Sequence, residues 1–287
     1  MRTAQKLIAK IGQLDSKGAR SGFRSAIERT VNKAVSEDKP LDFVVFTCST
    51  IDPKRLFSPK PWLYVSTDPA GNNLTPDVLR LQQAIKELKK IYPKTQLTVI
   101  IGNTDPYYIY LCQFRDFPKK KDVLWKKFAS RWRRYKNEFT DWLGAEASDM
   151  GANIVSWYRF EKDIEDKDGK SFEAEYQAVL KDIGVFFNKR QLDWEFRKLR
   201  TQFARGAYFD GLKKPVDALL KDWVRRKFAE YAVQGKWIYE SMPGSILIQN
   251  EKPSSLRSAM YQPVIKARYG NMLPVVYFLG IDDAGYQ

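Results

Sequence analysis

The sequence predicts an α/β protein built on a Rossmann-like, mostly parallel sheet flanked by helices. Short apolar runs typical of buried strands recur along the chain, and helical stretches separate them. Near the start, a strand, a helix and a second strand follow one another with short connections. This order is a βαβ unit, which makes the two strands parallel and their crossover right-handed.

The predicted elements continue this alternation to the end of the chain. Strands are expected at 43–48, 62–66, 97–101, 152–157, 246–248 and 275–279. One or two polar helices over residues 1–38 form an N-terminal extension, and a Rossmann-like catalytic domain covers 39–287. The chain is therefore expected to hold one large domain with a helical extension ahead of it.

Helix boundaries follow from local signals. Thr75 is a good N-cap and Pro76 suits the first helical position, so a helix should run from there to about Lys90. A long basic helix is expected over 119–143. Residues 171–240 read as helical, broken around 206–215.

Composition limits the classes of function. There are 49 Lys and Arg against 34 Asp and Glu, a net charge of +15, which favours a polyanionic partner such as nucleic acid or an acidic membrane surface. The N-terminus has no apolar signal region and no long apolar span occurs, so a cytoplasmic location is expected. Cys48 and Cys112 are expected to be buried free thiols.

The sequence has no histidine, which removes catalytic triads, histidine bases and most zinc or iron sites. Glycine-rich dinucleotide and P-loop motifs are also absent from it. We therefore expect no metal and no cofactor, and any pH dependence near neutrality must come from other groups.

A polar rim is predicted at the carboxyl ends of the strands, where open parallel sheets bind ligands. Its members are Thr47, Ser49, Thr50, Ser66, Thr67, Asp68, Asn103, Thr104, Asp105, Ser156 and Trp157. A serine nucleophile here would need a base other than histidine. The alternative is that these side chains cap the helices that follow.

Basic side chains gather on the helix expected over 119–143, interleaved with Trp132 and Tyr135. They are Lys119, Lys120, Lys121, Lys126, Lys127, Arg131, Arg133, Arg134 and Lys136. Such a surface suits phosphate contacts, although a plain solvated face is an equal alternative. Two further clusters favour RNA: Arg197, Lys198, Arg200 and Arg205, and then Lys221, Arg225, Arg226 and Lys227.

A third group of residues spans 231–262. Tyr231 and Gln234 lie three positions apart on one helix face, and Glu240 follows at the helix end. Tyr261 and Gln262 come after a Pro- and Ser-containing turn. Polar aromatic groups and a carboxylate near turns suit substrate binding and proton transfer, whereas the alternative is amphipathic core.

The order of these features resembles the tRNA-dependent cyclodipeptide synthases. That family has a Rossmann-like fold related to class I tyrosyl- and tryptophanyl-tRNA synthetases, and joins two amino acids from aminoacyl-tRNAs into a diketopiperazine. The resemblance implies that a strand-end serine, Ser49 or Ser66, becomes an aminoacyl ester. It also implies that Tyr231, with Gln234 or Glu240, holds the substrate amine, and that Tyr261 positions the ester or relays a proton.

The resemblance further implies that Asn103, Asp105 and Gln262 contact the substrate. It also implies that the basic helix binds tRNA, and that the protein has no membrane or DNA partner. The family's helix carboxylate is expected at 235, where this chain has Gly235. The chain therefore resembles a divergent branch, such as the fungal arginine-using synthases. Two rival functions remain: a non-catalytic basic RNA-binding α/β module, and a transferase using a nucleotide-sugar or S-adenosyl donor.

Overall fold

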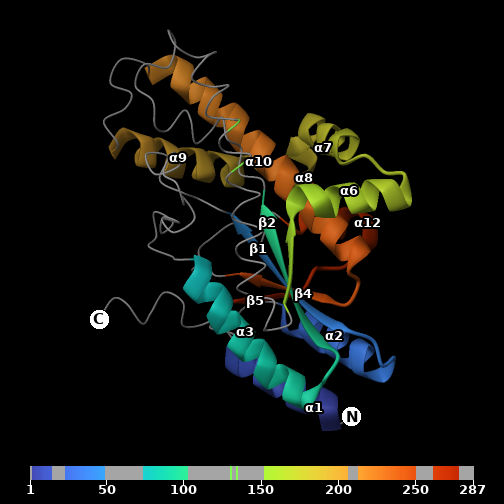
Figure 1. The fold of residues 1–287 in the computed structure, drawn as a ribbon. Coiled ribbons are helices and arrows are strands. Elements are labelled where there is room, and N and C mark those ends of the chain that lie inside the picture. The colour runs from blue at the N-terminus through green and yellow to red at the C-terminus, as the bar shows by residue number, and fades with distance from the viewer. Residues whose placement is uncertain are drawn as a thin grey trace.

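A five-stranded, fully parallel sheet forms the centre of the molecule, with helices on both faces (Figure 1). The computed structural model describes residues 2–14, 23–48, 74–102, 130, 134, 152–205, 213–249 and 261–277. The strands are β1 (Leu41–Cys48), β2 (Thr95–Gly102), β3 (Ala152–Ser156), β4 (Ser245–Gln249) and β5 (Val275–Tyr277). Their order, β3-β2-β1-β4-β5, confirms the predicted Rossmann-like fold class.

Strand β1 occupies the centre of the sheet. It pairs with β2 from Leu41↔Thr95 onward and with β4 from Asp42↔Ser245 onward. Phe43, Val44 and Val45 are all buried, as expected of a strand covered on both faces. The chain passes outward from β1 through β2 to β3 and then returns to β4 on the other side, so the topological switch point lies between β1 and β4.

Three helices, α1 (Arg2–Leu14), α2 (Arg24–Ser36) and α3 (Leu74–Ile91), lie together on one side of the sheet (Figure 1). Helix α1 buries Ala4, Leu7 and Ile11, whose spacing forms one apolar stripe. These residues belong to the same hydrophobic cluster as Val44 of β1. The two N-terminal helices therefore share the core of the domain.

Helix α10 (Lys213–Ser241) organises the other side of the sheet. It packs against α7 (Phe172–Lys181), α9 (Lys189–Arg205) and α12 (Pro263–Tyr269), and α6 (Trp157–Asp168) contacts β2 and β3. The short α8 (Ile183–Phe186) completes this layer. The turn at 242–244 joins the end of α10 to the start of β4, so α10 ends at the amino edge of the sheet.

The predicted elements agree with the structure except at some ends. Helix α3 ends at Ile91, and Ala84, Ile85 and Leu88 form its buried face. The strand expected at 152–157 ends at Ser156, because Trp157 is the buried first residue of α6. The strand expected at 62–66 lies outside the described residues, as does the helix over 119–143 apart from residues 130 and 134, which are helical. None of the helices in the described ranges has the length and apolar character needed to cross a bilayer.

Candidate functional site

The carboxyl edge of β1 and β4 is where this fold places a ligand. Ser49 directly follows the last residue of β1, Cys48. Several predicted site residues lie outside the described residues: Ser49, Ser66, Asn103, Asp105, Lys119, Lys120, Lys121, Lys126, Lys127, Arg131 and Arg133. Of the predicted tRNA-binding residues only Arg134 is described, and it is helical and exposed.

Ser156 shows the alternative role foreseen for the polar rim. Its hydroxyl accepts a hydrogen bond from the backbone N–H of Arg159 at 3.3 Å, and its backbone is extended. This is the geometry of an N-cap, which satisfies one of the unpaired amides in the first turn of α6. At this strand end, therefore, the hydroxyl caps a helix.

The two predicted tyrosines meet. The rings of Tyr231, on α10, and Tyr261, just before α12, are 5.2 Å apart between centroids and inclined at 83°. This edge-to-face contact is a favoured aromatic geometry. Tyr261 is buried and Tyr231 is half-buried. Two residues thirty positions apart in the sequence thus form one aromatic pair.

The same close approach explains the glycine at position 235. A Cβ at Gly235 would lie 2.3 Å from the backbone oxygen of Tyr261 and 2.8 Å from its Cα. No side chain can occupy that volume without moving the segment that carries Tyr261. The carboxylate that the family resemblance leads one to expect at 235 is therefore sterically excluded.

Gln234 is buried beside the tyrosine pair. Its Nε2 donates to Oε1 of Glu230 at 3.1 Å, while its Oε1 is buried and accepts no hydrogen bond within the described part of the chain. A buried acceptor without a donor costs free energy, on the order of 1–3 kcal/mol. Glu230 was not predicted from the sequence, although its spacing of four residues from Gln234 is the signal that identifies it.

A buried ion pair between Lys227 and Glu195 lies next to the Tyr231 ring. Nζ of Lys227 lies 2.7 Å from Oε1 of Glu195 on α9, and both side chains are largely buried. The same ammonium lies 5.0 Å from the centre of the Trp223 ring and 6.0 Å from that of Tyr231. Lys227 belongs to a cluster that was expected to favour RNA, but this expectation is wrong for Lys227, because its charge is already paired inside the α9–α10 contact.

Gln262 links the segment before α12 to the segment that follows it. Its Nε2 donates to the backbone oxygen of Leu273, and its Oε1 accepts from the backbone N–H of Leu273, both at 3.0 Å. The side chain is buried. Gln262 thus holds the approach to β5, and its predicted contact with substrate stays a prediction.

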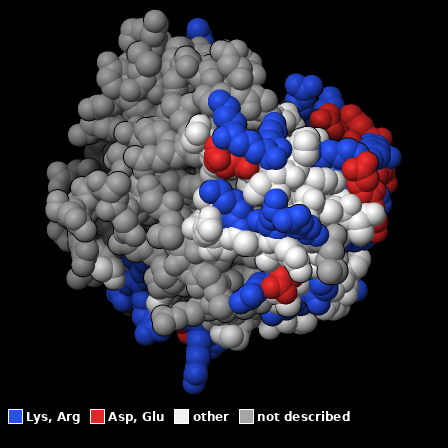
Figure 2. Space-filling model, turned by 90° about the horizontal axis from the view of Figure 1, so that it is seen from below, with Lys and Arg blue, Asp and Glu red and all other residues white. Residues whose placement is uncertain are grey.

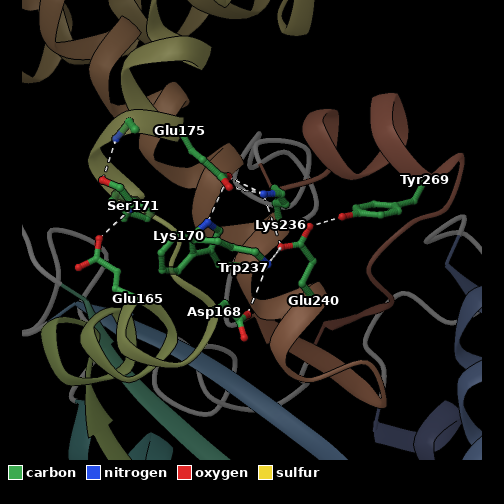
Figure 3. Close-up of polar contacts among 11 residues, drawn as sticks. Glu165, Asp168, Lys170, Ser171, Glu175, Lys236, Trp237, Glu240 and Tyr269 are labelled. Atoms are coloured by element: carbon green, nitrogen blue, oxygen red, sulfur yellow. Dashed lines mark hydrogen bonds and ion pairs between the residues drawn. The ribbon is translucent and has the colours of Figure 1, made fainter.

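Glu240 belongs to a separate charge network, drawn in Figure 3. Its carboxylate accepts hydrogen bonds from Tyr269 and from Lys170, the latter at 3.1 Å, and lies 3.5 Å from Nζ of Lys236. Burial alone would raise the pKa of Glu240, but these donors and the Lys236 charge lower it below its ordinary value. The carboxylate therefore stays ionised.

Lys236 is the centre of this network. It is 1% exposed, and its Nζ lies 2.5 Å from both carboxylate oxygens of Glu175 on α7. The indole N–H of Trp237 donates to the same carboxylate at 3.2 Å (Figure 3). The network connects α7, α10 and α12, and the partners of Lys236 and Glu240 outside α10 could not be identified from the sequence, because they are far away in the chain.

Glu240 and Tyr231 do not converge. They lie nine positions apart on α10, which places them half a turn apart around the helix and roughly 13 Å apart along it. Of the two candidates for an amine-binding partner of Tyr231, only Gln234 is near the tyrosine pair. The predicted group of Tyr231, Gln234, Tyr261 and Glu240 thus divides into two.

Charge is distributed unevenly over the molecule. Figure 2, seen from the side on which α1 and α2 lie, shows Lys and Arg spread over this face, with the largest group of acidic side chains at its upper right edge. Helix α1 carries three bases and no acid, whereas α6 carries five acids and three bases. In the described residues, no cluster of three or more His, Cys, Asp or Glu could hold a metal ion.

Comparisons with known proteins support the fold. No protein-family model matches the sequence, and no curated protein matches it. Among solved structures, the chain is similar to the PvcA protein from Pseudomonas aeruginosa, with a TM-score of 0.55 and 10% sequence identity over 98% of this chain and 84% of that one. At this identity the likeness concerns the fold alone.

Proposed function

We propose that the protein is an aminoacyl transferase that forms a cyclodipeptide from aminoacyl-tRNAs through a serine-linked aminoacyl-enzyme. One observation supports the proposal: Tyr231 and Tyr261, to which the family resemblance assigns the substrate amine and the ester, come together as one aromatic pair. Strand β4 spans five residues, about 16 Å, and the last ten residues of α10 cover about the same length. We propose on this basis that Tyr231 faces the carboxyl edge of β4.

In the proposed reaction, the Ser49 hydroxyl attacks the ester carbonyl of an aminoacyl-tRNA. The bond to the terminal ribose breaks, and the ribose hydroxyl leaves with a proton. The amine of a second aminoacyl-tRNA then attacks the serine ester, which frees the serine and forms a dipeptidyl ester. The terminal amine of that dipeptide closes the ring and releases the second tRNA.

These steps exchange esters or convert esters into amides, so they need no external energy source. The site must mainly position the reactants and stabilise the developing oxyanion. A tyrosine hydroxyl can supply a hydrogen bond or relay a proton without histidine. Tyr231 and Tyr261 are the residues for which we propose this role.

We propose that Gln234 contributes to binding the substrate amine. Its buried Oε1 lacks a donor among the described residues, and Glu230 adds a carboxylate beside it. An ammonium group would supply the missing donor and meet a negative charge. Glu240 is a weaker candidate, because Lys170, Lys236 and Tyr269 already surround its carboxylate.

The test is mass spectrometry of culture medium from a bacterial host that expresses the protein. Wild type should release a diketopiperazine that the empty host lacks, and Tyr261→Phe should reduce its yield at least tenfold. Tyr158→Phe is the matched control, because this tyrosine of α6 is 66% exposed. If no new diketopiperazine forms while the folded protein still binds tRNA, the proposal fails and the RNA-binding module takes its place.

A further inference from the structure

We infer that the exposed face of the α9–α10 helix pair is an RNA-binding surface in its own right, separate from the basic helix expected over 119–143. The inference deepens the proposed function, because it assigns the part of the protein that holds the tRNA backbone. We define the α9–α10 basic surface as the exposed residues Lys189, Arg190, Arg197, Lys198, Lys221 and Arg225.

The two helices carry a concentrated positive charge. Helix α9 has six Lys and Arg against two acids, and residues 213–227 of α10 have the same balance. Three of the four acids are already used: Glu195 pairs with Lys227, Asp217 with Arg200 and Asp222 with Arg226. Within the described residues, none of the six members of the α9–α10 basic surface forms an ion pair.

Neighbouring helices on the same side of the sheet differ in sign. Helix α6 has more acids than bases, and α7 has two acids and one base. A protein whose net charge served only solubility would not need six cations without ion pairs beside one another on α9 and α10. The segregation indicates a polyanion at α9 and α10.

Contacts between α9 and α10 hold the surface together. The contacts Arg200–Asp217 and Lys227–Glu195 join the helices in antiparallel register, and Lys221 lies over the Phe196 ring at 5.2 Å.

Trp194 is 39% exposed, and Nζ of Lys198 lies 5.4 Å from its ring centre. An exposed indole among cations suits an RNA, whose unpaired bases stack on aromatic rings, better than a lipid surface.

The α9–α10 basic surface also lies near the tyrosine pair, where the end of a bound tRNA is needed. Residues of α10 before Tyr231 extend beyond the carboxyl edge of the sheet, and α9 lies beside them (Figure 1). Arg225 is about 9 Å along the helix from Tyr231, and Lys221 about 15 Å. An RNA held on α9 and α10 can therefore present its end to the tyrosine pair.

The experiment compares two triple charge reversals of the full chain. One variant is Lys198→Glu, Lys221→Glu and Arg225→Glu. The control is Lys6→Glu, Arg29→Glu and Lys33→Glu on exposed positions of α1 and α2, which changes the net charge equally. Affinity for deacylated bacterial tRNA is measured by fluorescence anisotropy over a range of salt, with circular dichroism melting to confirm folding. A Gln version of the first variant replaces it if the Glu version does not fold.

The α9–α10 variant should lose roughly tenfold or more in tRNA affinity, and its log–log salt slope should fall by about 2–3. The control should retain most of the affinity. Equal losses in both variants, or no loss in the first, would overturn the inference. It would also be overturned if the first variant kept tRNA but lost binding to vesicles of phosphatidylserine and phosphatidylcholine. Because the tRNA is deacylated, the result does not depend on whether the proposed chemistry occurs.

Discussion

Gly235 is the residue at which the chain departs most clearly from the family it resembles, and packing explains the departure. The backbone of Tyr261 occupies the space where a side chain at 235 would stand. The helix therefore has no carboxylate at position 235, where the segment that carries Tyr261 approaches it closely. The hydrogen-bond acceptors nearby come from Gln234 and Glu230. A sequence shows the glycine but not the segment that requires it.

Replacing Gly235 with Ala should destabilise the protein by ~1–3 kcal/mol, because the new Cβ meets backbone atoms that cannot rotate away. Gly12→Ala is the control: it is also helical, with nothing within 4 Å of the added Cβ, and should be neutral or stabilising. Urea unfolding of both variants gives the comparison. Equal stability of the two variants would show that α10 does not approach Tyr261 this closely.

Glu161 predicts a pH dependence of stability. Burial, and then the negative charge of Glu165, raise its pKa from 4.5 to about 7, against a hydrogen bond with Trp157. The folded state therefore holds a proton that the unfolded state releases between pH 4.5 and 7, so this group's contribution falls as pH rises through that window and stays unfavourable above it.

Glu161→Gln should remove this penalty. We expect its Tm to exceed that of wild type by a few degrees at pH 8 and to match it near pH 4.5. Thermal unfolding at both pH values measures the effect. A variant that is equally stable relative to wild type at the two pH values would contradict the raised pKa.

At the scale of elements, α10 is the helix that connects the two halves of the site region. One side carries Tyr231 and Gln234, and the other carries Lys236 and Glu240, whose partners come from α7, α12 and the loop before α7. Lys236 lies in a buried stretch of α10, in which Val233, Trp237 and Ile238 are also buried. A lysine in such a stretch signals a buried ion pair, but nothing local identifies Glu175 as its partner.

Lys236→Met should destabilise the fold by about 3–5 kcal/mol, because it leaves the Glu175 carboxylate without its buried counter-charge. Adding Glu175→Gln should recover part of that loss. Asp168→Asn removes only an exposed ion pair with Lys170 and should cost under about 1 kcal/mol. Chemical unfolding of the three variants tests this, and additive effects of the two network substitutions would argue against the coupling.

At the scale of the molecule, the sequence was sufficient to predict the fold class. The apolar run at 43–48 identified the central strand, because a strand covered on both faces has no polar alternation. The Tyr231–Tyr261 meeting could be anticipated only through the family resemblance. The ion pairs Lys236–Glu175 and Lys227–Glu195 could not be predicted, because residues 61 and 32 positions apart are brought together by helix packing alone.

We propose that a serine at the end of a strand carries the aminoacyl ester, and this step can be tested directly. Purified protein is incubated with radiolabelled aminoacyl-tRNA and quenched in acid, and label on the protein is measured. Wild type should hold label that mild base releases, and Ser49→Ala should lose it, or failing that Ser66→Ala. Ser25→Ala, an exposed serine of α2, is the control and should label as wild type does. If Ser49→Ala and Ser66→Ala both keep full label, the serine-ester mechanism is wrong.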